Sequence, residues 1–138
     1  MIMSSRLQKK SLKTVVILAA TLALAACVSK PIYNVESRSF TSEAKLPIAT
    51  IQQKIKLIGA DRGWTFQDVT PGHMIGSVGT AKHNAKVDLN YTETTFSIKY
   101  LSSYQLKANG ATIHHRYNRW VENLERDLVI KLGLASNS

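Results

Sequence analysis

The chain has 138 residues, of which 44% are hydrophobic and 20% are charged, and its formal net charge is +9. This length suits one compact domain rather than two, and the single cysteine excludes an internal disulfide. The basic balance leaves nucleic acid and an anionic membrane surface as partners to be weighed.

The N-terminal stretch has the three parts of a secretory signal peptide. An apolar run from Val15 to Leu24 is followed by small residues. This run is too short for a membrane span of ~20 apolar residues, and a transmembrane helix with Cys27 as a buried thiol is the alternative. The basic leader that precedes the run is made of Arg6, Lys9, Lys10 and Lys13.

The segment Leu24-Ala25-Ala26-Cys27 ends this stretch and contains the only cysteine of the chain. It resembles the lipobox of bacterial lipoproteins, in which small or aliphatic residues precede the cysteine that receives the lipid. The resemblance implies that residues 1–26 are a cleaved lipoprotein signal peptide. Cys27 would become the first residue of the mature protein and would carry a diacylglyceryl group and an amide-linked acyl chain such as palmitate.

The residue after the cysteine and the charge of the mature chain bear on location. In Gram-negative lipoproteins, Asp at this position commonly retains the protein in the inner membrane, so Val28 implies the periplasmic face of the outer membrane. Four of the eighteen basic residues lie in the signal peptide, and the other fourteen with nine acidic residues leave a net charge of +5. This excess indicates a solvated surface with mild attraction to anionic envelope polymers, and no nucleic-acid binding.

The mature chain begins with a polar segment and continues into one predicted domain. Residues 27–45 are predicted to be a lipidated tether that lets the domain clear the lipid head groups, with a possible edge strand near Tyr33–Phe40. Residues 46–132 are predicted to form an α+β domain, and residues 133–138 a tail.

The first helix is predicted from Pro47 to Arg62. Pro47 suits the first helical turn, where its missing N–H costs no hydrogen bond, and Gly63 is a natural C-terminal stop. Isoleucines recur at intervals of three and four, which places them on one face of the helix: Ile48, Ile51, Ile55 and Ile58.

Between Trp64 and Leu101 the period of the apolar residues changes from 3.6 to 2. Thr70-Pro71-Gly72 is a turn, because proline fixes φ and glycine supplies a positive φ. The alternation indicates an antiparallel sheet with one buried and one wet face, and the short connections indicate a meander. The strands are predicted at Trp64–Gln67, Met74–Thr80, Lys86–Tyr91 and Phe96–Tyr100.

The longest helix is predicted from Ile113 to Leu132, after a connection at Ser102–Ala111. Its polar side carries two i,i+4 pairs in the favourable order, Glu122–Arg126 and Asp127–Lys131. Its apolar stripe is made of Ile113, Tyr117, Trp120, Val121, Leu124, Leu128 and Leu132.

Together these elements predict a two-layer α+β fold, an antiparallel β-meander covered on one face by two helices. The other face of the sheet would be polar. The predicted core consists of Ile51, Ile55, Ile58, Trp64, Phe66, Val87, Leu89, Phe96, Ile98, Tyr117, Trp120, Leu124 and Leu128.

The mature chain holds no recognisable catalytic motif, so we expect no enzyme. No serine lies in a G-x-S-x-G turn, and Cys27 is taken by the lipid. Helical His ligands of a metal are usually four residues apart, and Asn118 and Arg119 follow His114 and His115 at that spacing. We therefore expect no metal and no cofactor, with one histidine packed against the strands and the other solvated.

The start of the long helix is the hypothesised contact with a partner, because interfaces favour Arg and aromatic residues over Lys, Glu and Asp. The alternative is an ordinary solvated helix end. Asn118 and Asn123 are poor helix formers, and they either bond loop backbone or face the partner. The hypothesised contact set is His114, His115, Arg116 and Arg119, with Tyr104 from the preceding loop.

Four parts of the chain together resemble a family of small, uncharacterised lipoproteins of Gram-negative bacteria. They cover most of residues 46–130 and are Gly63-Trp64, Lys86–Tyr91, Phe96–Tyr100 and Ile113–Leu124. The family has no established activity and no catalytic residues to carry over. The layout is also similar to the helix-grip domains of a lipoprotein in the outer-membrane barrel assembly machine, which bears on the fold alone.

The sequence therefore predicts a lipid-anchored, non-catalytic envelope module that binds a protein or an envelope polymer. The alternative is a small-ligand carrier or sensor with a pocket between the long helix and the sheet. In that pocket Gly76 and Gly79 would allow close approach, unless they only mark a bulge. An apolar pocket of roughly 300 Å³ or more would favour the carrier.

Overall fold

The structure is a computed structural model that describes residues 28–40 and 45–134. The predicted signal peptide, the lipobox and Cys27 lie outside the described residues, as does the end of the predicted tail. The described elements, in chain order, are β1 (Ser29–Pro31), β2 (Val35–Ser39), α2 (Ile48–Ala60), β3 (Thr65–Thr70), β4 (His73–Gly79), β5 (Asn84–Tyr91), β6 (Thr95–Tyr104), β7 (Thr112–His114) and α3 (His115–Leu134).

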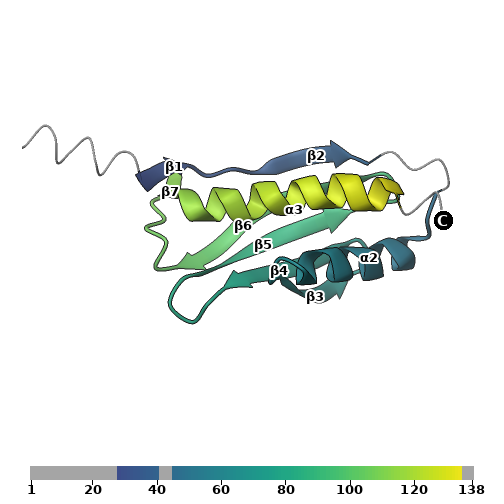
Figure 1. The fold of residues 1–138 in the computed structure, drawn as a ribbon, viewed down its shortest axis with the longest axis horizontal. Coiled ribbons are helices and arrows are strands. Elements are labelled where there is room, and N and C mark those ends of the chain that lie inside the picture. Colours follow the sequence, from purple (N-terminus) through teal and green to yellow (C-terminus); the bar gives the residue numbers. More distant parts are fainter. Residues whose placement is uncertain (1–27, 41–44, 135–138) are drawn as a thin grey trace, which may run out of the picture.

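The main sheet has five antiparallel strands in the order β2-β6-β5-β4-β3, and β1 pairs with β7 in a separate two-stranded sheet. Both helices lie on the same face of the five-stranded sheet, with α3 over the β2–β6 side and α2 over the β3–β4 side (Figure 1). The predicted two-layer α+β fold, a meander covered on one face by two helices, is confirmed.

Helix α2 forms close to its predicted bounds because its local signals agree. Pro47 lies just before the first helical residue, and the N–H groups of Thr50 and Ile51 bond to its carbonyl. Past the C-terminal end, Gly63 adopts a φ of 82°, and the Trp64 N–H returns to the Gly59 carbonyl at 3.0 Å. The side chains buried under the helix are Ile51, Ile55 and Ile58, whereas Ile48 is exposed.

The alternation in the strands separates the two faces of the sheet as predicted. Val87, Leu89, Phe96 and Ile98 are almost completely buried beneath the helices. Of the predicted core, only Phe66 and Trp120 are partly rather than fully buried. Further side chains complete the core, including Met74, Val78, Ala85, Tyr91, Leu106 and Leu132.

The two strand glycines serve packing and a turn. A Cβ on Gly76 would come within 2.9 Å of the Phe66 ring, so glycine lets this ring cross the strand. Gly79 has a φ of 111° and lies against the backbone of His83, where the chain turns towards β5. Gly76 therefore serves the contact with Phe66, and Gly79 serves the turn before β5.

The predicted tether at 27–45 needs correction, because its first half is part of the folded domain. β1 pairs with β7, and β2 pairs with β6 at the edge of the main sheet. Val35 and Phe40 are buried in the core. The expected edge strand near Tyr33–Phe40 is present as β2. The residues of β2 are mostly polar and exposed because an edge strand covers little apolar surface. This composition is also typical of a linker, which is why the sequence predicts a tether here.

The predicted start of the long helix at Ile113 is wrong by two residues. Ile113 and His114 belong to β7, where Ile113 stands opposite Lys30 and is fully buried. The His114 N–H donates to the Leu106 carbonyl at 2.8 Å, and the helix begins at His115. Pairing with a strand more than eighty residues away therefore overrides the helical spacing of Ile113.

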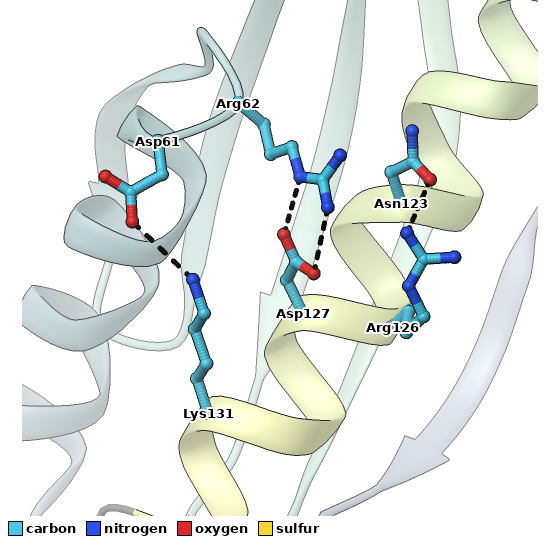
Figure 2. Close-up of polar contacts among 6 residues, drawn as sticks. All are labelled: Asp61, Arg62, Asn123, Arg126, Asp127 and Lys131. Carbon is cyan, nitrogen blue, oxygen red and sulfur yellow. Dashed lines mark hydrogen bonds and ion pairs between the residues drawn. The ribbon is translucent and has the colours of Figure 1, made fainter.

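The predicted i,i+4 pairs on α3 are replaced by contacts to other partners (Figure 2). Asp127 accepts hydrogen bonds from Arg62, at 2.8 Å from Nε and 3.4 Å from Nη2, and this contact raises the pKa of the Arg62 guanidinium. Lys131 pairs with Asp61 at 3.5 Å, and Arg126 donates to Asn123 at 2.9 Å. The turn after α2 lies beside α3, so Asp127 and Lys131 pair with Arg62 and Asp61, whereas Arg126 bonds within α3.

Candidate functional site

Asn118, on the second turn of α3, holds the connection between β1 and β2. Its Oδ1 accepts a hydrogen bond from the Tyr33 N–H at 3.0 Å, and its Nδ2 donates to the Pro31 carbonyl at 2.8 Å. Next to it, the Ile32 N–H donates to the Ala111 carbonyl at 3.0 Å. Asn118 thus bonds loop backbone, the first of its two predicted roles, while Asn123 bonds only Arg126.

A second contact ties the same N-terminal segment to α3. The Tyr33 hydroxyl donates to Glu125 Oε2 at 2.6 Å, and Arg38 Nε lies 3.6 Å from Glu125 Oε1. The hydrogen bond to Glu125 is the main reason that the pKa of Tyr33 rises to about 12. Asn118 and Glu125 are seven residues apart and therefore share a face of the helix. This face of α3 was not predicted from the sequence, although the seven-residue spacing of Asn118 and Glu125 indicates it.

The two histidines meet at the junction of β7 and α3. Their rings stack with centroids 4.5 Å apart, and both are partly buried. His114 lies in β7 and His115 lines a surface cavity at the start of α3, and neither ring is fully buried or fully exposed, so the expected division into one packed and one solvated histidine stays a prediction. His114 Nδ1 accepts a hydrogen bond from the Arg116 N–H at 3.1 Å.

Several cations surround this histidine pair. The pKa of His114 is lowered, first by burial and then by the nearby positive charges of His115, Arg116 and Lys107, with a smaller effect of His83. Lys107 reaches this position through a loop in which Gln105 and Lys107 both adopt a φ of 54°. Leu106 between them is buried, so Lys107 is held outward.

A surface cavity of about 430 Å³ lies between β1 and the start of α3. It is lined by Lys30, Pro31, His115, Asn118, Arg119 and Glu122. We call the whole cationic surface around this cavity the basic end, and it consists of Lys30, Lys107, His114, His115, Arg116 and Arg119. The structure therefore groups the four predicted contact residues of β7 and α3 and adds Lys30 and Lys107 to them.

Tyr104 is a more distant member of the predicted contact set. It ends β6 with 53% of its surface exposed, and its hydroxyl accepts a hydrogen bond from Gln105 at 3.1 Å. Two residues after Tyr104, the Leu106 carbonyl accepts a hydrogen bond from the His114 N–H, and the chain reaches the basic end there. Tyr104 thus lies beside the loop and not in the cavity.

The basic end gathers four cations that have no carboxylate partner among the described residues. Lys30, Lys107, Arg116 and Arg119 are exposed, and none of them forms an ion pair within residues 28–40 and 45–134. Elsewhere in these ranges the ion pairs are Arg38–Glu125, Lys56–Asp68, Arg62–Asp127, His73–Asp88, Lys99–Glu36 and Lys131–Asp61, while Lys45, Lys54, Lys82, Lys86 and Arg126 also form none.

The space between α3 and the sheet, where a carrier would hold its ligand, is filled by core side chains. Val121, Leu124 and Leu128 are fully buried there, and the Tyr117 ring packs edge-on against Tyr100 at 5.4 Å. A cavity of about 500 Å³ lies on the helix-free face of the sheet. It mixes polar and apolar side chains: Thr65, Phe66, Gln67, Ile75, Ser77, Lys86, Leu101 and Ser102.

Among the described residues, no three His, Cys, Asp or Glu side chains are grouped so that they could hold a metal ion. Within the same part of the chain, no helix is long and apolar enough to cross a membrane. No known family matches the chain, and no curated protein is similar to it in sequence. The lipobox and the likeness to small Gram-negative lipoproteins therefore remain predictions.

Asn118→Ala should loosen the N-terminal segment, because Tyr33 N–H and the Pro31 carbonyl both lose their partner. We expect a loss of about 1–2 kcal/mol in the free energy of unfolding, measured by urea titration with circular dichroism. Asn123→Ala is the matched control, since it gains the same helix propensity but loses only a bond to Arg126. Equal unfolding midpoints for the two variants would contradict the assigned role.

Proposed function

We propose that the protein is a lipid-anchored, non-catalytic module of the cell envelope. A lipid on Cys27 holds it on the periplasmic face of the outer membrane, and its basic end binds an envelope protein or polymer. The observation that supports this most strongly is the fixed position of the segment that follows Cys27. Because β1 pairs with β7 and Asn118 clamps the next residues, an anchor at Cys27 would hold the domain at one defined end.

The charge of the basic end indicates the kind of partner. Arg116 and Arg119 are exposed and without carboxylate partners among the described residues, and arginine is enriched in protein interfaces. Two further exposed cations without a carboxylate partner among these residues, Lys30 and Lys107, lie at the same end, so this surface suits an acidic partner. The partner is therefore expected to present carboxylate or phosphate groups.

Crosslinking in intact cells followed by mass spectrometry tests this proposal. Arg116→Ser/Arg119→Ser should reduce the yield of partner crosslinks by about tenfold or more, because an interface arginine can contribute over 1 kcal/mol of binding energy. Circular dichroism confirms that the variant is folded. Arg126→Ser/Lys131→Ser removes the same charge from the other half of α3 and should keep the partner profile. An unchanged profile in the first variant would exclude the basic end as the contact.

A further inference from the structure

The position of the first strand determines where the lipidated residue lies. Ser29 is two residues after Cys27, so the two Cα atoms are at most about 7 Å apart. In the β1–β7 pair, Ser29 stands opposite His114 and Lys30 stands opposite Ile113. A lipid carried two residues before Ser29 would therefore leave only a short linker between the membrane and β1.

The same end collects cations from three parts of the chain. Lys30 comes from β1, Lys107 from the loop after β6, and Arg116 and Arg119 from the first turns of α3. All four are exposed, and their only acidic neighbour lining the cavity is Glu122. Anionic lipid head groups attract basic residues within a Debye length of the surface, which is about 8 Å in physiological salt.

We propose that the basic end docks on the anionic phospholipid head groups of the membrane in which the Cys27 lipid is inserted. The proposal rests on the proposed lipid anchor, and it gives the basic end to the membrane surface in place of an envelope protein or polymer. Loss of partner crosslinks in Arg116→Ser/Arg119→Ser with unchanged energy transfer in Arg116→Gln/Arg119→Gln would favour the protein or polymer and overturn docking. The anchor keeps the basic end at a high local concentration near the head groups, and the cations set the orientation of the domain. With the basic end on the membrane, the β5–β6 turn at the opposite end of the domain would point towards the periplasm (Figure 1).

The test uses the full lipidated protein in vesicles and measures how close each end lies to the lipid. Cys27 is the only native cysteine, and its thiol is consumed by the lipid, so one introduced cysteine can be labelled selectively. Ala108→Cys places a donor dye beside Lys107, and Thr94→Cys places it before β6. The ten residues of β6 separate these positions by roughly 30 Å. Acceptor dye on the lipid head groups reports proximity by energy transfer.

In vesicles that contain phosphatidylglycerol, transfer should be high from Ala108→Cys and low from Thr94→Cys. Pure phosphatidylcholine or high salt should lower the transfer from Ala108→Cys. Each basic residue shifts the docked-to-undocked ratio by roughly fivefold, so Arg116→Gln/Arg119→Gln should reduce it by about 30-fold. Arg126→Gln/Lys131→Gln removes equal charge from the same helix farther along and should leave the ratio unchanged.

Three results would overturn the proposal, and they separate it from the anchor. If energy transfer from Ala108→Cys does not depend on lipid charge while the protein stays on the vesicles, docking is refuted but the anchor is not. Equal transfer in the two double variants would refute the role of the basic end. Protein that leaves the vesicles in every lipid composition would refute the anchor and docking together.

Discussion

Cys27→Ala is expected to abolish palmitate labelling and to move the protein from the membrane fraction to the soluble periplasm. The predicted anchor consists of three acyl chains, and each buried methylene contributes about 0.8 kcal/mol, so their loss should change the distribution almost completely. Fractionation, labelling and gel mobility measure the outcome.

Val28→Ala is the matched control for this experiment. It changes the neighbouring residue but keeps the cysteine and the small-residue segment before it, so it should stay lipidated and membrane-bound. If Cys27→Ala fractionates and migrates like the wild-type protein, the lipobox prediction is wrong. A soluble Cys27→Ala protein would also show that the cations of the basic end do not hold the protein on the membrane without the lipid.

Leu128→Ala is expected to destabilise the fold strongly. Its side chain is fully buried between α3 and the sheet, and removing it leaves a cavity. Such substitutions cost about 2–5 kcal/mol, a large part of the stability of a small domain. Urea unfolding followed by circular dichroism gives the free energy of unfolding.

Leu57→Ala makes the same chemical change on α2, where the side chain is 70% exposed, and should cost no more than about 0.5 kcal/mol. A similarly small loss for Leu128→Ala would indicate loose packing beneath α3. That result would return the ligand-carrier alternative to consideration, since the pocket predicted for a carrier lies in this space.

The candidate site could be predicted in part, because some of its residues are neighbours in the sequence. His114, His115, Arg116 and Arg119 were identified from one segment of mixed aromatic and basic character. Lys30 and Lys107 were not, because the first reaches the site by strand pairing and the second through a loop held by Leu106. Contacts between segments that are distant in the chain leave no periodic pattern in the sequence of either segment.

The sequence by itself determined the two amphipathic helices, the antiparallel meander and most of the core. Those features depend on the period of apolar residues and on local turn residues, which act within a few positions. Only the tertiary structure decided that Ser29–Pro31 form a strand with β7, that Ile113 leaves the helix, and that Asp127 pairs with Arg62. The physical reason is common to all three. Each depends on a partner distant in the chain, whose hydrogen bond or charge outweighs a local preference of a few tenths of a kcal/mol.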